Sequence, residues 1–556
     1  MTVDSRIQPS GGVLSRLGST DDVDAAIADV DGEIERLLER RSLLRTCRNT
    51  FAPVFGFPAE IFSRIFETCV GECADAASRA ILLITLTHVC RYWRYAALQD
   101  PKLWEHADFT HPEIGYTMLT RAANHPVSLT FPFSADRRRQ LQALDSLLGR
   151  KEHILSLDIT AFFRELETEF RSILCGPAPL LERLRLCNAD PTGTALQLTP
   201  ADFPSSGQHL RELELSGFTP PPSLSIFSGL TRLSIRNLRC CTYSPVISFV
   251  DVLSLLMQLP ELIDFELQQK KVTDRTFRQA PLTPLERPVE LPVLKRIRLD
   301  DTTNMIPIGL FLLSLSSPSL DLLDIRSKEE NPVSLHQTGE WLRGWIQASN
   351  QQSLAAMSLA LNNKNFKVLL TRSGHDSDQG SQGCFEMSLE RETWLAAVEH
   401  FFFGLVHCEL IPANLMRGLT TLELTATGLD DVTPQSSLIK WSDFASLPAL
   451  TSISLDEIPC WTFLNFVQTA LKASPFPALR SLMLRNVIMW QEIRDWDSPS
   501  TTLHAIIRSL VSWLRYRRDH GMQIQHLMLK DCYCLYDPHA ELQPLVANFM
   551  MEPEAF

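Results

Sequence analysis

Cysteine and histidine supply the side chains of this sequence that could bind a metal ion. Cys532 and Cys534 lie one residue apart, and His526 and His539 are nearby in the sequence. Two cysteines at this spacing share one face of a strand, which is compatible with metal ligation. However, no Cys-x-x-Cys occurs, and no second ligand pair completes the four that a structural zinc site needs. The sequence therefore favours core packing for these cysteines.

The other residues that could act in catalysis lack a supporting constellation. His407 and Cys408 are adjacent, and adjacent side chains on a helix do not face each other. Cys90 fits a thiol nucleophile only in residue type, because it lies in an apolar helical pattern. The segment His375–Asp378 has acidic residues but not the rest of a calcium-binding loop. Phosphate-binding Gly-rich motifs are missing as well, so we expect no enzymatic activity, no metal and no cofactor.

Composition and charge argue against two classes of partner. The 556 residues carry 52 Lys and Arg against 65 Asp and Glu, a net charge of −13. Nucleic acid needs clustered positive charge, and the short basic runs at 137–139 and 515–518 are expected to be solvated helix faces. No apolar stretch approaches the ~20 residues of a membrane span. No secretory signal opens the chain and its 13 cysteines are an odd number, which favours reduced thiols in the cytoplasm or the nucleus.

Two helical patterns between residues 57 and 104 could form a docking surface. Pro58 suits the start of a helix, Glu60 favours its positive end, and apolar residues follow at 61, 62, 65 and 66. A second apolar stripe runs from 86 to 93, and Asp100-Pro101 ends that helix. A fragment of this size cannot bury two such stripes alone, so the pattern predicts a partner.

This arrangement resembles the F-box, a small helical module that docks a Skp-type adaptor within cullin-based ubiquitin ligases; here it would span residues 53–108. The family usually has Leu where this chain has Phe57, and the polar insert Gly71–Ser78 lengthens the connection between the helices. The resemblance implies that the adaptor, and through it a cullin, binds the residues that match the motif: Pro58, Glu60, Ile61, Ile65, Phe66, Val89, Cys90, Trp93, Leu103 and Trp104. The alternative is a helical hairpin that only caps the next domain.

The segment before this module has the pattern of a helix. Residues 1–20 are rich in Ser and Gly and are expected to be disordered. Within 21–50, aliphatic residues follow spacings of three, four, three and seven, namely Ile27, Val30, Ile34, Leu37 and Leu44. The pattern predicts a helix, either as a short coiled coil or packed back on the F-box-like module. A helix directly before the box resembles the layout of fungal F-box proteins.

The rest of the chain repeats a strand pattern, L-x-x-L-x-L, with aliphatic residues at the first, fourth and sixth positions. Copies begin at residues 154, 181, 210, 230, 262, 294, 320, 354, 419, 450, 479 and 524. Helical patterns lie between many of them, at Phe249–Leu259, Glu340–Ala348, Arg391–Val406, Trp461–Ala473 and Leu503–Arg518. Strands that alternate with helices predict parallel pairing. We therefore expect an α/β fold, in which a helical F-box is followed by a curved leucine-rich-repeat-like solenoid over residues 109–556.

Two segments interrupt the repeat. Phe366–Arg372 and Phe385–Leu389 are strand-like and are separated by the polar residues Ser373–Gly383. This segment is either a hairpin with a loop insertion near residues 371–384 or a repeat that begins near Cys384 after an insertion. The proline-rich segment 281–292 is a second irregular connection.

The third and fifth residues of each copy point away from the leucines, because side chains alternate along a strand. In the first half their charge alternates from strand to strand: Arg183 and Arg185, Glu212 and Glu214, Arg232 and Ser234, Asp264 and Glu266, Arg296 and Arg298, Leu322 and Asp324. If the strands pair in register, each arginine lies ~5 Å from its neighbours' carboxylates. We expect this ladder to neutralise itself and to hold the register. In a rival interpretation, the ladder itself binds a zwitterionic target segment.

The corresponding residues of the second half are neutral or soft and suit a peptide. They are Thr421 and Glu423, Ser452 and Ser454, Ser481 and Met483, and His526 and Met528. The whole pattern predicts a non-catalytic substrate receptor, in which the F-box docks the adaptor and the C-terminal half binds an unknown target protein. The alternative is a leucine-rich-repeat-like interaction scaffold that is not coupled to ubiquitination.

Overall fold

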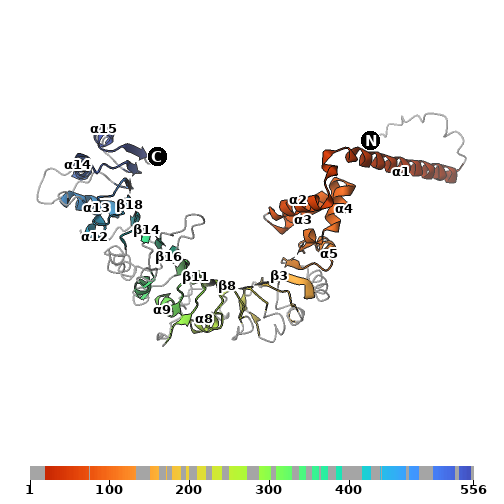
Figure 1. Cartoon of the computed structure of the whole chain (residues 1–556), viewed down its shortest axis with the longest axis horizontal. Coiled ribbons are helices and arrows are strands. Elements are labelled where there is room, and N and C mark those ends of the chain that lie inside the picture. The colour runs from red at the N-terminus through yellow and green to blue at the C-terminus, as the bar shows by residue number, and fades with distance from the viewer. Residues whose placement is uncertain are drawn as a thin grey trace, which may run out of the picture. The chain divides into compact units, whose positions relative to one another are not determined.

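The structure of the chain is a computed structural model with side chains (Figure 1). It describes residues 19–73, 75–132, 151–161, 171, 178–189, 196–199, 209–220, 228–240, 249–271, 287–301, 308–327, 337–342, 344–345, 354–361, 365–372, 384–390, 416–426, 439, 441–470, 475–487, 505–532 and 537–552. The N-terminal tail up to residue 18, the insertion at 373–383 and the expected helix Arg391–Val406 lie outside these ranges. The chain divides into two compact units, Met1–Thr130 and Phe131–Phe556.

The first unit is mainly helical and ends in one strand–helix–strand element. Its elements are α1 (Thr20–Thr50), η2 (Pro53–Gly56), α2 (Ala59–Gly71), α3 (Ala76–Val89), α4 (Arg91–Gln99), η3 (Pro101–Trp104), β1 (His106–Asp108), α5 (Pro112–Arg121) and β2 (Val127–Phe131). The helix expected over 21–50 is therefore confirmed. It begins at a capping box, in which Ser19 and Asp22 each bond the other's backbone amide. β1 and β2 pair in parallel, with Ala107 opposite Leu129.

Cys90 divides the second helical pattern, which the sequence suggested as one continuous helix. Its backbone is extended (φ −159°, ψ 170°), so α3 ends before it and α4 begins after it. The Cys90 sulfur accepts a hydrogen bond from the Trp93 amide at 3.4 Å and thereby caps α4. In the same way Asp100 caps η3 through the Lys102 amide, which confirms the expected end of the helix at Asp100-Pro101.

The second unit is built on a large, mostly parallel sheet, which confirms a mixed α/β fold. Its strands are β3 (Ile154–Ala161), β4 (Arg183–Asn188), β6 (Glu212–Ser216), β8 (Arg232–Cys240), β9 (Asp264–Lys271), β11 (Arg296–Asp301), β13 (Leu322–Ser327), β14 (Leu354–Leu361), β15 (Asn365–Arg372), β16 (Cys384–Glu390), β17 (Thr421–Ala426), β18 (Ser452–Glu457), β19 (Ser481–Arg485), β20 (His526–Lys530) and β21 (Asn548–Glu552). Two short parallel pairs stand apart, β5 (Leu196–Gln197) with β7 (Phe218–Thr219) and β10 (Val289–Glu290) with β12 (Leu315–Ser316).

Helices in the connections supply further apolar side chains to this unit. They are α8 (Phe249–Leu256), α9 (Ile308–Leu313), α12 (Trp441–Ala445), α13 (Ile458–Thr469), α14 (Ala505–Asp519) and α15 (His539–Leu542), with short 3-10 turns η4 (Lys151–His153) and η9 (Gln543–Leu545). α8, α13 and α14 confirm the helices expected near Phe249, Trp461 and Leu503. Residues 337–342 and 344–345 are also helical, where the sequence predicted a helix over Glu340–Ala348.

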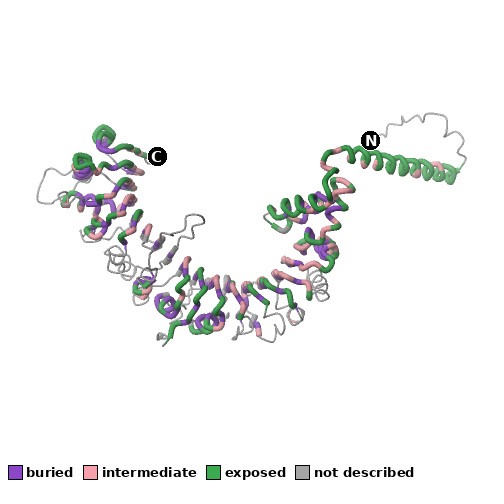
Figure 2. Tube along the Cα trace, viewed as in Figure 1, coloured by how far each residue is buried: buried purple, intermediate pink, exposed green. Residues whose placement is uncertain are grey.

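The leucine pattern forms the core of this sheet. Figure 2 shows buried and less buried residues alternating along the strands. In β6, for example, Leu213 and Leu215 are buried while Glu212 and Glu214 remain partly exposed. In the copies whose leading side chain the structure describes, the leading aliphatic residue, such as Leu210 or Leu230, is buried as well. The spacing therefore identified the strands and their buried face.

The strand order departs from the chain order at one place. From β3 to β13 the strands pair in parallel with their successors along the sheet, and so do β17 to β21. Between them β15 pairs antiparallel with both β14 and β16. β16 rather than β14 adjoins β13, and β14 adjoins β17. The expected hairpin is therefore present and β16 is also in register with β13, but β14 does not follow β13 in the sheet.

In the basic run at 515–518, Arg515 and Arg518 are exposed as the sequence suggested, but Arg517 is not. Arg517 on α14 is only 1% exposed, whereas its neighbour Arg518 is solvated and pairs with Asp519. The run at 137–139 lies outside the described residues.

Candidate interaction surfaces

The helical unit closes over an aromatic cluster. Phe62 and Phe66, one turn apart on α2, are fully buried. Trp93 on α4 packs against both, with ring centroids 5.6 and 5.2 Å away, and the Tyr92 ring meets Phe62 edge-on at 5.4 Å. The Tyr92 hydroxyl donates to the Phe57 carbonyl at 2.9 Å, which fixes the chain just before α2.

The apolar residues of α2 divide into two stripes, so the interpretation of positions 61, 62, 65 and 66 as one docking stripe is wrong. Phe62 and Phe66 face the core, whereas Ile61 and Ile65 are each 44% exposed. On α3, Ile81 and Val89 are also exposed, at 65% and 54%. Exposed large aliphatic side chains on two helices, four residues apart on α2 and eight apart on α3, are the kind of surface that a protein partner covers.

The motif residues fall into three groups by burial. Pro58, Glu60, Ile61, Ile65 and Val89 are exposed, and Cys90 and Trp93 are partly exposed at the start of α4. Phe66, Leu103 and Trp104 are buried within the unit itself. Their side chains pack inside the unit and hold its helices together instead of contacting a partner directly.

Trp104 links the helices to the strand–helix–strand element. Its indole nitrogen donates to the Ala97 carbonyl at 2.8 Å, and the Arg121 guanidinium of α5 lies 4.4 Å from its ring centroid. Burial lowers the pKa of Arg121, and the charge of Arg94 lowers it further. A cation over a buried aromatic face contributes to packing, so this tryptophan has a structural role.

The polar insert between α2 and α3 contains a helix cap. Asp75 accepts hydrogen bonds from the Ser78 amide and hydroxyl, both at 2.7 Å. These bonds lower the pKa of the Asp75 carboxyl. The insert therefore starts α3 with an N-cap and leaves both helices intact.

The charge ladder of the first half has the register that the sequence predicted. Arg183 lies opposite Glu212, and Arg185 opposite Glu214. Glu214 accepts from two sides, since its Oε1 atom is 3.2 Å from Arg185 Nε and 3.0 Å from Arg236 Nη1. Arg185 reaches back to Asp158 of β3 at 3.1 Å as well.

The ladder continues through Arg236, which the sequence interpretation did not include. Its Nε and Nη2 atoms donate to the two carboxylate oxygens of Glu266, both at 3.1 Å, and Ser234 donates to Glu266 at 3.2 Å. Burial opposes ionisation of Glu266, but these hydrogen bonds hold its pKa below the ordinary value. The residue was detectable, because it stands two positions beyond Ser234 and therefore on the same face of β8.

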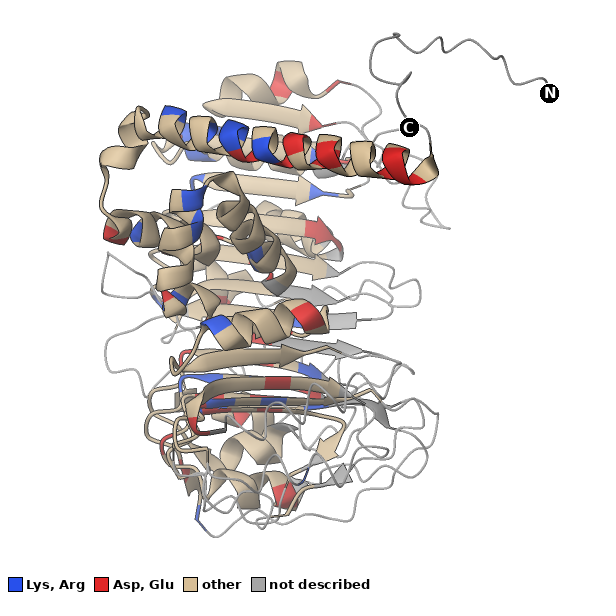
Figure 3. Cartoon of the chain, turned by 90° about the vertical axis from the view of Figure 1, so that its right-hand side faces the viewer, with Lys and Arg blue, Asp and Glu red and all other residues tan. Residues whose placement is uncertain are grey.

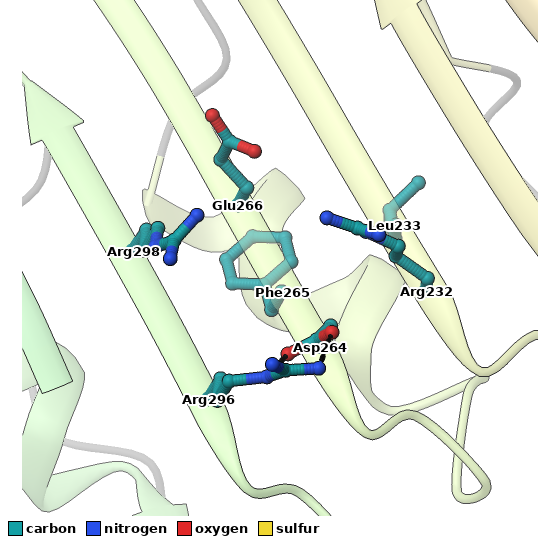
Figure 4. A pocket seen from close by; sticks show the side chains of 7 residues that line it. All are labelled: Arg232, Leu233, Asp264, Phe265, Glu266, Arg296 and Arg298. Carbon is teal, nitrogen blue, oxygen red and sulfur yellow. Dashed lines mark hydrogen bonds and ion pairs between the residues drawn. The ribbon is translucent and has the colours of Figure 1, made fainter. Parts of the chain in front are cut away.

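The side chains of Arg232 and Arg298 in the ladder make no hydrogen bond or ion pair with the described part of the chain, contrary to full self-neutralisation. They line a small pocket over β9, formed by Arg232, Leu233, Asp264, Phe265, Glu266, Arg296 and Arg298. In Figure 4, Arg232 from β8 and Arg298 from β11 extend toward the space above β9 from opposite sides, while Arg296 pairs with Asp264. Glu266 is already bonded to Arg236. Two uncommitted guanidinium groups across one strand can bind an oxyanion.

Asp324 is the least satisfied group of the same face. Its Oδ1 atom is buried and accepts no hydrogen bond, although Arg326 Nε lies 3.7 Å away. Another carboxylate, Glu386 of β16, is directly opposite in the register. Burial raises the pKa of Asp324, which the nearby arginines only partly oppose.

The structure brings the eight expected target-binding residues together on one face of the second half. Thr421, Ser452, Ser481 and His526 form one row of register partners, and Glu423, Ser454, Met483 and Met528 form the next. Met550 of β21 extends the second row and is 50% exposed. The sequence interpretation missed it, although Val546, Phe549 and Met551 repeat the spacing of the leucine pattern without a leucine.

This face is partly committed to internal contacts. Glu423 accepts from the Ser358 hydroxyl at 3.1 Å and lies 3.9 Å from Arg485 Nη1. Arg485 Nε also donates to the Met483 sulfur at 3.1 Å. Ser454, Met528 and Met550 therefore remain the more available contacts of the second row.

The sequence candidates for metal binding do not form a site in the described residues. Cys532 is buried, and its thiol donates to the Leu484 and Lys530 carbonyls at 3.4 and 3.3 Å. His539 packs its ring against Phe549 instead. Cys534, His407-Cys408 and the segment His375–Asp378 lie outside the described ranges, and elsewhere no group of three ligating side chains is present.

No family model matches the chain, and no curated protein is detectably similar to it. Within the described ranges, every helix is too short or too polar to cross a lipid bilayer.

Proposed function

We propose that this chain is the target-recognition subunit of a Skp–cullin–F-box type ubiquitin ligase, acting in the cytoplasm or the nucleus. The observation that carries the proposal is the division of α2 and α3. The aromatic residues of α2 and α4 build the core of the unit, while Ile61 and Ile65 of α2 and Val89 of α3, at positions that match the F-box pattern, stay exposed. A Skp-type adaptor would cover these aliphatic side chains, with Pro58 and Glu60 at the start of the same surface.

In this proposal the second unit is a leucine-rich-repeat-like solenoid that holds the target. Its parallel strands with an in-register leucine core support this architecture. The subunit itself performs no chemistry. It raises the local concentration of target lysines near a ubiquitin thioester carried by other subunits.

Two parts of the sheet are candidates for target contact. The rows ending in Met528 and Met550 suit an apolar or polar peptide, because methionine adapts to varied partners. The pocket between Arg232 and Arg298 suits a segment with a carboxylate or phosphate group. Photo-crosslinking amino acids placed at Met528 or at Arg298 distinguish them, since only the correct position should link the chain to a ubiquitinated protein.

Adaptor capture by co-expression tests the proposal. We expect the wild-type chain to retain a Skp-type adaptor and the double variant Ile61→Asp/Ile65→Asp to lose it. Val250→Asp is the matched control, because Val250 is 56% exposed on helix α8 of the second unit. Phe66→Ala should lose capture together with helical structure, since it removes a buried ring.

Two outcomes would overturn the proposal. One is a folded wild-type chain that retains no adaptor; the other is capture by the Ile61→Asp/Ile65→Asp variant at the wild-type level. Either result would favour an interaction scaffold that is not coupled to ubiquitination.

A further inference from the structure

Helix α1 exposes an apolar seam that is interrupted once, at Arg41. Val23, Ile27, Val30, Ile34, Leu37 and Leu44 are between 38% and 63% exposed, and no residue of the helix is buried. Their spacing alternates between four and three if Arg41 takes the place between Leu37 and Leu44. This is the a/d repeat of a two-stranded coiled coil.

Nothing in the described part of the first unit, residues 19–73 and 75–130, buries the seam. Near the C-terminal end of α1, Ser42 accepts a hydrogen bond from Arg91 at 3.0 Å, and Ser42 is off the seam. An isolated amphipathic helix gains most of its stability from packing its apolar face. A helix with 31 residues, its own capping box and no buried side chain therefore requires a partner.

The charges of α1 are divided between its two halves, and Figure 3 shows carboxylates in one half and mainly basic residues in the other. Residues 20–35 contain seven carboxylates and neither Lys nor Arg: Asp21, Asp22, Asp24, Asp29, Asp31, Glu33 and Glu35. Residues 36–50 contain five arginines and one carboxylate: Arg36, Arg40, Arg41, Arg45, Arg48 and Glu39. A parallel pair would place like charges together, whereas an antiparallel pair would place each acidic half beside a basic half.

The seam and the charges define the same centre of symmetry. A two-fold axis midway between Ile34 and Leu37 passes between Glu35 and Arg36, where the charge changes sign. This axis sets Ile34 opposite Leu37 of the second copy and Ile27 opposite Leu44. Arg41 then faces Val30 of the second copy, which is flanked by Asp29 and Asp31.

We propose that α1 pairs with α1 of a second copy of this chain as an antiparallel two-stranded coiled coil. At ~1.5 Å per residue the overlap is ~46 Å long. The dimer joins two receptors through a segment outside the adaptor-binding surface, so it does not depend on the proposed function. Because the pairing uses opposite charges on exposed faces, it weakens as ionic strength rises.

Sedimentation velocity of the full chain over a range of concentrations tests the pairing. The wild-type chain should approach about twice the monomer mass, and Ile34→Glu should remain monomeric, because it places two carboxylates at the centre of the seam. Leu43→Glu is the matched control and should still dimerise, since Leu43 is 57% exposed, compared with 48% for Ile34, but lies off the seam. A wild-type chain that remains monomeric at all concentrations would refute the proposal.

Crosslinking tests the orientation without depending on a destabilised variant. In a Cys47→Ser background, chains carrying Ile27→Cys are mixed with chains carrying Leu44→Cys and treated with a short bismaleimide. The antiparallel pair should give the 27–44 link, identified by mass spectrometry, and no 27–27 link, because those positions are ~26 Å apart in that orientation. A 27–27 link would show a parallel pair, and the absence of any link at α1 would rule out the seam.

Discussion

Arg517 offers the most direct test of how the C-terminal part of the sheet is held together. It projects from α14 into the interior, where Nη1 donates to the carbonyls of Pro475 (3.0 Å) and Phe476 (2.7 Å). Nη2 donates to Leu479 (2.9 Å), and Nε donates to Met522 (3.0 Å). The guanidinium thus ties the loop before β19 and the turn after α14 to one helix. We expect Arg517→Met to loosen this whole region.

The size of the effect follows from the groups that lose a partner. The Phe476 carbonyl still accepts from the Leu479 amide at 3.2 Å, but three carbonyls lose their donor, at ~1–3 kcal/mol each. Burial lowers the pKa of Arg517 to about 10, which means that the buried charge itself destabilises the folded state. Replacing the cation by methionine therefore adds back roughly 3 kcal/mol of unfolding free energy. The net loss is roughly 3 kcal/mol, or about a 100-fold increase in local opening.

Hydrogen exchange followed by mass spectrometry measures this opening segment by segment. Amides of β19 and β20 should exchange about 100-fold faster in Arg517→Met, whereas β4 and β6 should be unaffected because each strand contacts only its neighbours. Arg518→Ala is the control, since it removes an exposed arginine from the adjacent position. Arg517→Lys should restore little, because an ammonium group cannot reach all four carbonyls. If Arg517→Met exchanges like Arg518→Ala, the four hydrogen bonds do not hold this region.

Three further variants test other parts of the structure. Glu214→Arg should destabilise the first half of the sheet by ~1–2 kcal/mol in urea unfolding, because it replaces two ion pairs with repulsion, and unchanged unfolding would show that the ladder does not hold the register. Asp324→Asn should stabilise the chain at pH 7, because the raised pKa of Asp324 means that its ionised carboxylate destabilises the folded state. The difference in unfolding free energy between the variant and the wild type should disappear below pH 3.8, the ordinary pKa, where the carboxyl is protonated in the folded and the unfolded chain. A gain that persists at pH 3 would contradict this reasoning. Gly115→Ala should cost ~1–3 kcal/mol in thermal unfolding, because its Cβ would lie 2.9 Å from the Phe109 ring, whereas Gly71→Ala, with open space around it, should be neutral.

The strands and their register could be predicted because the leucine pattern is local and repeated. Alternating side chains fixed which residues share a face, so the ladder and the two C-terminal rows were identified before the structure was known. The pairing of β13 with β16 could not be predicted in this way, because every strand carries the same pattern and any two can pair. Phe62 and Ile61 show a similar limit: apolar residues at i and i+1 span a wide arc of a helix, and spacing does not show which edge faces inward. Arg517 was misjudged because a buried cation satisfied by carbonyls has no signature in the sequence.

The strand order β13–β16–β15–β14–β17 has a consequence for synthesis of the chain on the ribosome. Strand β13 ends at Ser327, and β16, which pairs with the edge of β13 away from β11, begins only at Cys384. The ribosome must therefore add 384 − 327 = 57 further residues before this edge can pair. At ~5–20 residues per second, the edge stays open for roughly 3–11 seconds. In that interval β14 has emerged but has no place beside β13, and an unpaired parallel edge is a template for unwanted strand addition. The open edge of β13 therefore needs protection, for example by a chaperone, until the antiparallel segment is complete.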